Sequence, residues 1–286
     1  AGDDTLDGGI GVDQASYAGN ESVTVEWSTS GSAVVKGLSS GSIVGTDTLT
    51  SIEEVLGGDA NDLFQAATGN AFVTGVAWDG SAGTDTLNLA SASGANNFKV
   101  NFSAASGYAL IDGSNVSQSL RNIENLTLGA GRDTIIGDNA GINNVINGGG
   151  DSADEYDLTV ASIGLAVTVN AGNIVVRGTS GVVGTDVLSN VEIVRTGESN
   201  DTIFGVRNGI TIDANDNTSN NDTDSIDLSD ALLAPLSGSD GYTVNLDHAA
   251  GSVRSKDGSV NQVLKHFENA VGTAGNDTFL FDFGFG

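Results

Sequence analysis

The 286-residue chain has 37 acidic and 10 basic residues, a formal charge of −27, 41 Gly and no Cys. This charge argues against nucleic-acid binding, because phosphate contacts require clustered Lys and Arg. The lack of Cys excludes a disulfide framework and thiolate metal sites, and the alternation of Val, Ile and Leu with polar residues excludes a disordered acidic tail.

The predicted elements are short strands separated by turns rich in Gly and Asp. Period-two alternation predicts strands over 22–27 and 33–36, then a Gly-Thr-Asp corner at 45–47 and a strand over 52–56. The same order predicts later strands over 98–102, 109–112, 165–169, 174–177, 242–246 and 252–254. The segment 120–126 has the length of a short helix, but its counterparts are short and β-branched, so we assign it to a strand. Helix content is therefore expected to be very low, and no apolar run approaches the about 18 residues of a membrane span.

Two sequence markers recur with a common period. An Asp that precedes an apolar residue or a Thr-apolar pair stands at Asp62, Asp133, Asp201 and Asp277. An apolar-Glu pair lies nine residues before each, at Glu53, Glu124, Glu192 and Glu268, and both markers step by 71, 68 and 76 residues. Self-similarity of this kind is typical of a solenoid. The pattern predicts an all-β fold, a parallel β-roll or β-helix solenoid built from four degenerate repeats of about 70 residues.

The repeats predict one elongated domain with units of approximately 1–62, 63–133, 134–201 and 202–286. Because the chain opens at Ala1 without Met or a signal-like segment, we expect it to be a piece of a longer protein.

The acids are expected in turns, since Asp bonds its own backbone and Gly accepts positive φ. Of the 37 acids, 28 are Asp. Turns that stack at the interstrand spacing of about 4.8 Å bring carboxylates together, where they repel by roughly 1 kcal/mol even in water. The cation that suits such oxygen ligands is Ca²⁺.

One motif indicates where calcium would bind. The segment Gly8-Gly9-Ile10-Gly11-Val12-Asp13 fits the Gly-Gly-x-Gly-x-Asp element of the nonapeptide calcium repeat. A degenerate copy spans 2–6, and looser copies span 57–62, 129–133, 148–154 and 272–277. At these residues the chain resembles the RTX, or hemolysin-type calcium-binding, repeat proteins of bacteria.

The resemblance implies a parallel β-roll whose Gly-rich turns hold Ca²⁺ with Asp carboxylates and backbone carbonyls. Carried over position by position, the metal ligands are Asp4, Gly9, Gly11, Asp13, Asp62, Asp133, Asp154, Asp201 and Asp277. The chain departs from the pattern at Arg132, which stands where Asn61, Asn200 and Asn276 precede the other marker acids. An ion-free alternative is open: an Asp at a turn can cap the backbone and stack as a hydrogen-bonded ladder.

Two other acidic features are given structural interpretations. The apolar-Glu pairs are predicted to lie on strands, with the Glu on a solvated face. The dense acids Asp213, Asp216, Asp222, Asp224 and Asp227 resemble an EF-hand loop only superficially, because Thr218 stands at loop position six and Asp224 at position twelve. A loop at the flank of the solenoid is the favoured interpretation.

Catalytic motifs are sparse, and the chain is predicted not to be an enzyme. Its two His residues lie in no HExxH spacing, and the segment 37–41 fits GxSxG without the strand-elbow-helix context. Parallel β-helices can cleave acidic polysaccharides with a pair of acids, but the spacing here selects no such pair.

By its resemblance, the chain is expected to be a non-catalytic, calcium-stabilised structural solenoid of a large secreted bacterial surface protein, exported by type I secretion. A surface layer, an adhesin and an extracellular fibre all fit, with an extracellular or cell-surface location. The expected partners are calcium ions and either further copies of the chain or other surface or matrix components; the apolar segment 279–285 is a candidate contact. The alternative is a module of a secreted polysaccharide-modifying enzyme that binds and positions glycan.

Overall fold

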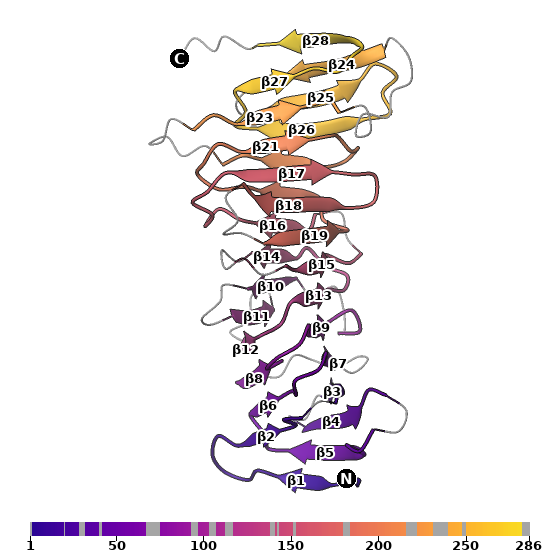
Figure 1. Ribbon diagram of the computed structural model, residues 1–286, viewed down its shortest axis with the longest axis vertical. Helices are drawn as coiled ribbons and strands as arrows, with labels where there is room; N and C mark the ends of the chain where they lie inside the picture. Colours follow the sequence, from indigo (N-terminus) through magenta and orange to yellow (C-terminus); the bar gives the residue numbers. More distant parts are fainter. Residues whose placement is uncertain are drawn as a thin grey trace. The chain divides into compact units, whose positions relative to one another are not determined.

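Figure 1 shows a computed structural model of the chain. It describes residues 2–19, 21–28, 32–39, 42–66, 75–92, 97–102, 107–111, 117–137, 141, 143–150, 153–179, 184–215, 222–230, 240–247 and 250–281. These residues form 28 strands and no helix, which confirms the all-β prediction. Within the same ranges, no helix is long and apolar enough to cross a bilayer.

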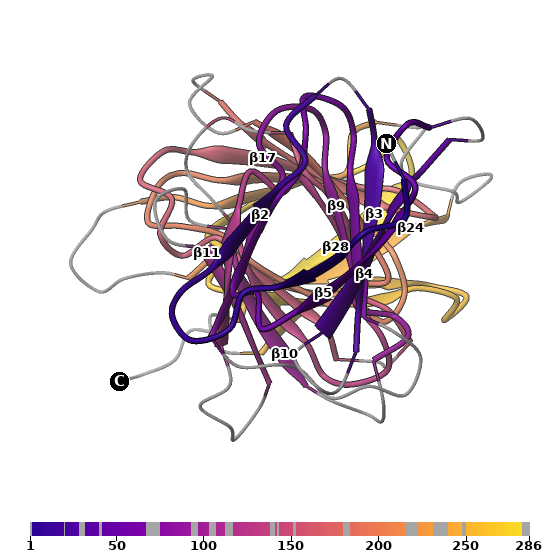
Figure 2. The same cartoon turned by 90° about the horizontal axis from the view of Figure 1, so that it is seen from below.

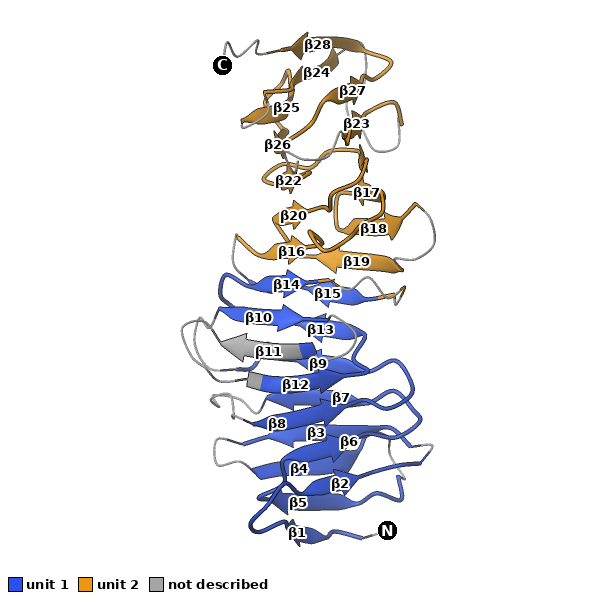
Figure 3. Cartoon of the chain, turned by 90° about the vertical axis from the view of Figure 1, so that its left-hand side faces the viewer, with its two compact units in different colours: residues 1–136, 144–151 blue, residues 137–143, 152–286 orange. Residues whose placement is uncertain are grey.

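The chain divides into two compact units, coloured separately in Figure 3. Unit 1 holds residues 1–136 and 144–151, and unit 2 holds 137–143 and 152–286. The division does not test the predicted single domain, which stays a prediction. Each unit contains strands of two sheets, sheet A and sheet B, which we describe unit by unit.

In unit 1, sheet A has the order β1 (Thr5–Asp7), β5 (Thr46–Thr50), β4 (Ser32–Gly37), β3 (Val23–Trp27), β7 (Leu63–Ala66), β9 (Thr86–Asn88), β13 (Asn125–Thr127) and β15 (Val145–Asn147). Sheet B has the order β2 (Gln14–Ser16), β6 (Glu54–Leu56), β8 (Val76–Asp79), β12 (Ser117–Arg121), β11 (Gly107–Ile111), β10 (Phe98–Asn101) and β14 (Thr134–Ile136).

In unit 2, sheet A has the order β19 (Thr185–Ser189), β18 (Ile174–Gly178), β17 (Leu165–Val169), β21 (Thr202–Phe204), β23 (Ser225–Asp227) and β27 (Asn269–Val271). Sheet B has the order β16 (Glu155–Asp157), β20 (Ile193–Arg195), β22 (Thr211–Asp213), β26 (Asn261–Lys265), β25 (Gly251–Ser255), β24 (Asp240–Asn245) and β28 (Asn276–Leu280).

Many strands are only three residues long, with a central apolar side chain that faces the core. Ile135, Ile203 and Ile226 occupy this central position and are 0% exposed, while the residues on either side of each are partly exposed. Because alternate side chains point to opposite faces of a strand, one apolar residue per short strand is enough to build the interior. The long parallel sheets that result are compatible with a β-solenoid.

Among the strand pairs whose register the structure describes, the pairing is parallel except in four three-stranded meanders, which the sequence analysis did not anticipate. They are formed by β3–β5, β10–β12, β17–β19 and β24–β26, whose consecutive strands pair antiparallel. A few residues suffice to join antiparallel strands, whereas parallel neighbours need a longer crossover. At β17–β18, for example, the amide of Asn170 donates to the carbonyl of Asn173 and closes a short turn. The first two strands of each meander were predicted, but β5 begins within the predicted corner at 45–47, no strand was predicted over β26, and the antiparallel direction was not predicted.

Within each unit the two meanders belong to opposite sheets. In unit 1, β3–β5 lie in sheet A and β10–β12 in sheet B; in unit 2, β17–β19 lie in sheet A and β24–β26 in sheet B. Figure 2 shows β2 of sheet B across the interior from β3 and β9 of sheet A. The meander of each successive sequence repeat therefore lies in the sheet opposite to that of the repeat before it.

The prediction that the apolar-Glu pairs lie on strands is wrong. The strand predicted over 52–56 begins only at Glu54, and Ile52 and Glu53 lie at the bend that precedes it. Likewise the segment 120–126 is divided between β12 and β13 by a bend at 122–124. At these bends a residue with left-handed backbone precedes each apolar-Glu pair, namely Ser51 (φ 52°), Asn122 (φ 52°), Asn190 (φ 49°) and His266 (φ 61°).

Replacing Ser51 with Gly is expected to stabilise unit 1 by about 0.5–1 kcal/mol, because Gly adopts positive φ without the steric cost that Ser bears there. The matched control is Thr50→Gly, at the neighbouring exposed end of β5, which should destabilise by a similar amount because Gly weakens a strand. Urea unfolding followed by circular dichroism measures both. Destabilisation by both variants would contradict the assignment.

Candidate functional site

The acids that mark the repeats lie at corners, where the chain bends into a strand, and most of them face inward. Seven such carboxylates are at most 2% exposed: Asp62, Asp85, Asp133, Asp154, Asp186, Asp201 and Asp224. Burying a charge costs several kcal/mol unless it is paired and hydrogen-bonded. Their partners therefore decide what these corners can do.

Each of four marker acids accepts a hydrogen bond from the backbone of the neighbouring strand. The amide of Val23 donates to Asp62 Oδ1 at 2.7 Å, and the amide of Leu165 donates to Asp201 Oδ1 at 2.6 Å. Equivalent bonds join Phe98 to Asp133 and Tyr242 to Asp277. In three of the four, the donor is the first residue of the first strand of a meander, and the acid immediately precedes the strand that pairs with it in parallel. In the fourth, Tyr242 lies within β24 and Asp277 within its parallel partner β28. This is the ladder that the ion-free alternative predicts.

Neighbouring corners are also joined by hydrogen bonds between a backbone amide of one corner and a side-chain oxygen of the other. The amide of Asp62 donates to Asp85 Oδ1 at 2.6 Å, while the amide of Thr84 donates to Asn61 Oδ1 at 3.0 Å. The two hydrogen bonds are reciprocal, because each corner supplies one amide donor and one side-chain acceptor. The same exchange joins Asn200-Asp201 to Thr223-Asp224 and Asp3-Asp4 to Thr46-Asp47. This explains why Asn-Asp and Thr-Asp pairs recur at the corners.

Glycine precedes Thr-Asp where the chain crosses close to its neighbour. Gly83 has φ +130°, and a Cβ atom there would lie 2.7 Å from the carbonyl oxygen of Ala60. Only Gly combines that backbone conformation with so close an approach.

The Glu of each apolar-Glu pair completes a second kind of corner. Glu124 Oε2 accepts the amide of Asp85 at 2.8 Å, and the carbonyl of Asp85 accepts the amides of Glu124 and Asn125. The same exchange joins Asp13 to Glu53, Asp154 to Glu192 and Asp224 to Glu268. These Glu side chains were predicted to be solvated only; the signal that could have identified them is their fixed spacing of nine residues before the marker Asp.

Burial makes several corner acids hard to ionise. It raises the pKa of Asp85 and of Asp201 to about 7, and that of Asp224 to about 8; the pKa of Asp62 is also raised. Neighbouring acids add to the effect, Asp62 and Glu124 at Asp85, and Asp201 and Glu268 at Asp224. Among the described residues, no Lys or Arg pairs with these four carboxylates. The backbone amides that donate to them, a bound proton or a cation from solution can offset their charge.

A different set of acids closes surface turns where strands end. Asp7, Asp79, Asp157 and Asp227 each accept the amide of the residue two positions later. Such Asx-turns are local and need no ion. The Asp-rich composition thus serves two distinct roles.

The acids of segment 213–230 are not gathered around one centre. Asp213 ends β22 in sheet B, where His266 Nδ1 lies 2.7 Å from its Oδ1 and Arg195 and Lys265 also pair with it. Asp224 precedes β23 in sheet A, and Asp227 is its last residue. Asp216 lies outside the described residues. This supports the interpretation of the segment as structural.

The Asp4 and Asp13 turns fit a cation only in part. Asp4 precedes β1 of sheet A and Asp13 precedes β2 of sheet B, so the two acids belong to different corners. Gly9 (φ +80°) lies in the intervening turn and donates its amide to Asp7 Oδ1, and Gly11 follows it. Asp13 Oδ2 is buried and no described group donates to it, which suits a cation. However, no three His, Cys, Asp or Glu side chains of the described residues form a group that could hold a metal ion.

Buried oxygens of this kind recur at other corners. Asp85 Oδ2, Asp224 Oδ2 and both carboxylate oxygens of Asp222 are buried without a donor among the described residues. Asp222 lies close enough to raise the pKa of Asp201 and of Asp224. Asp85 and Asp222 were not among the predicted ligands, because neither follows the Gly-rich motif. The donor chemistry suits a hard cation, although the acids alone would not complete its coordination.

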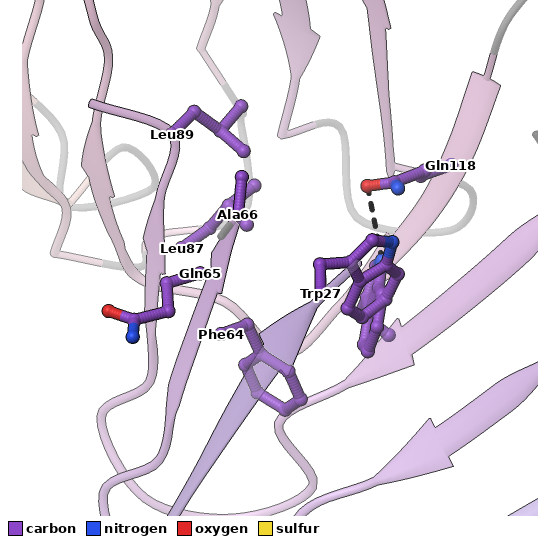
Figure 4. A pocket seen from close by; sticks show the side chains of 8 residues that line it. Trp27, Phe64, Gln65, Ala66, Leu87, Leu89 and Gln118 are labelled. Carbon is purple, nitrogen blue, oxygen red and sulfur yellow. Dashed lines mark hydrogen bonds between the residues drawn. The ribbon is translucent and has the colours of Figure 1, made fainter. Parts of the chain in front are cut away.

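The aromatic residues contribute to the core of unit 1. A small cavity is lined by Trp27, Phe64, Gln118 and five neighbours, and the indole of Trp78 donates to Gln118 Oε1 at 3.1 Å (Figure 4). Trp27 and Trp78, the two Trp residues of the chain, are 7% and 2% exposed. They therefore offer no open stacking platform for a glycan.

Comparison with known proteins adds no identity: neither a family model nor a curated protein sequence matches the chain.

Asp62→Ala is expected to lower the free energy of unfolding by about 2–4 kcal/mol, because it leaves two buried amide donors, those of Val23 and Gly58, without an acceptor. The matched control is Asp59→Ala, an exposed acid three residues earlier, which should change stability by less than about 0.5 kcal/mol. Urea unfolding at constant pH makes the comparison. Equal effects of the two changes would contradict the role of the corner.

In chelator, stability is expected to fall as the pH rises from about 4 to about 8. The raised pKa values of Asp85, Asp201 and Asp224 mean that the folded state binds more protons than the unfolded state in this range, so unfolding becomes easier as the protons leave. Melting temperatures in EGTA at pH 5 and pH 8 test the sign. Asp224→Asn, which keeps an acceptor for the Asp201 amide, should flatten the slope, and Asp227→Asn should not.

Proposed function

We propose that this chain is a non-catalytic structural solenoid of a large secreted bacterial surface protein, stabilised by calcium. The observation that carries the proposal is the series of buried corner carboxylates that hold neighbouring strands together while no described Lys or Arg pairs with Asp62, Asp85, Asp201 or Asp224. Such a scaffold binds its strands through repeated backbone contacts, and its function is to span distance and present surface.

Four degenerate repeats are supported by corners that recur at corresponding positions. The reciprocal Asp–Glu exchange occurs four times, each time following a residue with left-handed backbone two positions before the Glu. Local hydrogen bonds that return with the sequence period favour a structural repeat over a coincidence of composition.

Calcium binding is supported by three observations. The motif at 8–13 resembles the RTX calcium repeat, Asp13 Oδ2 is buried without a described donor, and similar oxygens occur at Asp85, Asp222 and Asp224. Asp13, with the carbonyls of Gly9 and Gly11 beside it, is the proposed first ligand set. The ion would supply positive charge that the chain lacks at these corners.

This arrangement would couple folding to the calcium concentration of the compartment. Where calcium is scarce, ionised corners repel one another and oppose folding; where it is abundant, binding to the folded state alone stabilises that state by mass action. An extracellular or cell-surface location, reached by type I secretion, follows from the RTX resemblance. Surface-layer, adhesin and fibre roles all agree with such a scaffold.

We expect saturating Ca²⁺ at pH 7.5 to raise the melting temperature by several degrees over EGTA, because a ligand at about 100 times its dissociation constant contributes about 2.7 kcal/mol. Circular dichroism measures the melt, and isothermal titration calorimetry measures binding of Ca²⁺ alone. Asp13→Asn should reduce the heat and the gain in melting temperature, while the exposed control Asp59→Asn should leave both unchanged. Identical β content and melting temperature in EGTA and in millimolar Ca²⁺ would refute the proposal.

A further inference from the structure

One side of unit 1 leaves two strands unpaired along one edge. Within the described residues, β1 pairs only with β5 and β2 only with β6, so each presents a free row of N–H and C=O groups. Leu6, the central residue of β1, is 38% exposed, whereas its partner Leu49 is 1% exposed. An open hollow beside these strands is lined by residues 4–6 and 14–17 and by Asp47.

One side of unit 2 is open in the same way. Among the described strands, β27 pairs only with β23 and β28 only with β24. Phe279 is 38% exposed although its partner Val244 is fully buried, and Leu280 and Phe281 are 47% and 60% exposed. Edge strands with exposed large apolar side chains are sites of pairing with another chain.

We propose that these two open edges bind each other between two copies of this chain, with β28 of one copy pairing to β2 of the next and β27 pairing to β1. Sizes of the inward-facing residues are complementary in both sheets. Phe279 would meet Ala15 and fill the hollow of unit 1, and Leu6 would meet Ala270. A large residue thus faces a small one in each sheet, as close packing requires.

The corner hydrogen bonds have a direction that agrees with this pairing. At several acidic corners the backbone amide of the earlier strand donates to the carboxylate of the later strand, as from Asp4 to Asp47 and from Asp62 to Asp85. Asp13 stands two residues before Ala15, and Asp277 stands two residues before Phe279. With β28 beside β2, the Asp277 amide would face the Asp13 carboxylate and continue the same ladder between copies.

The contact joins the β1 and β2 edge of one copy to the β27 and β28 edge of another, so it is heterologous. Each added copy still presents one open edge for a further copy. This inference concerns the 286-residue chain itself, and it rests on the proposed scaffold function in that both need a folded chain. It adds the identity of a partner, a second copy, and the strands that bind it. Its experiment separates assembly from folding and from calcium binding.

Sedimentation velocity of the whole chain in Ca²⁺ tests the contact. For the unaltered protein, the weight-average mass should rise about twofold or more above 28.7 kDa between about 1 and about 100 µM. Leu6→Lys should block one edge and Phe279→Lys the other, so each variant alone should stay monomeric. An equimolar mixture should form one-to-one dimers, because each variant keeps the edge that the other lacks.

The matched control is Val160→Lys, which charges a residue of unit 2 that is 54% exposed and lies outside both edges; it should assemble like the unaltered chain. Circular dichroism melts verify that all variants fold. A monomeric unaltered chain at every concentration would overturn the proposal, as would assembly of either single variant or a mixture that fails to dimerise. Loss of calcium dependence with assembly intact would count only against the proposed function.

Discussion

The structure depends on one interaction: a buried carboxylate at a corner accepts a hydrogen bond from the backbone amide of the neighbouring strand. It helps to fix the position of three-residue strands such as β14 and β21, and it satisfies amides that the bend would otherwise leave unpaired. Asp fits because its short side chain reaches the adjacent backbone without leaving the corner. At the second kind of corner Glu accepts the amide instead, as Glu124 does from Asp85.

The same interaction creates an electrostatic problem. Acids that follow one another along a sheet, such as Asp62, Asp85 and Glu124, are linked through their amides and repel through their charges. Hydrogen bonds to backbone amides favour the ionised form, and burial opposes it; at Asp85 and Asp224 burial prevails. The stability of the native state is thus sensitive to any proton or cation from the solvent that offsets the charge of these acids.

Much of the fold could be predicted from the sequence, because period-two alternation and turn residues report directly on short strands. The predicted strands 22–27, 165–169 and 174–177 match β3, β17 and β18 closely. Their antiparallel pairing could not be predicted, since alternation tells which face a side chain occupies and not which way the neighbouring strand runs.

The sequence predicted which Asp residues form the candidate site, but it did not predict which groups those residues contact. The recurring Asp positions do lie at stacked corners, but their partners are backbone amides some 35–40 positions away in the chain, as in Asp133 with Phe98, and no local pattern specifies them. The Glu partners were missed because a Glu after an apolar residue is normally a solvated one. Asp62 and Asp85 accept backbone amides, whereas Asp13 Oδ2 and both carboxylate oxygens of Asp222 are buried without a donor among the described residues, and it is on these oxygens that the calcium proposal rests.

The exchange of meanders between the sheets has a consequence for how such a chain can lengthen or shorten. Loss of a single repeat would place a segment whose strands suit one sheet into the other sheet. Every loop and side chain after the junction would then project from the opposite face. Gain or loss of two periods at once preserves the orientation of everything downstream. Evolution and protein engineering alike should therefore tolerate changes in this array by pairs.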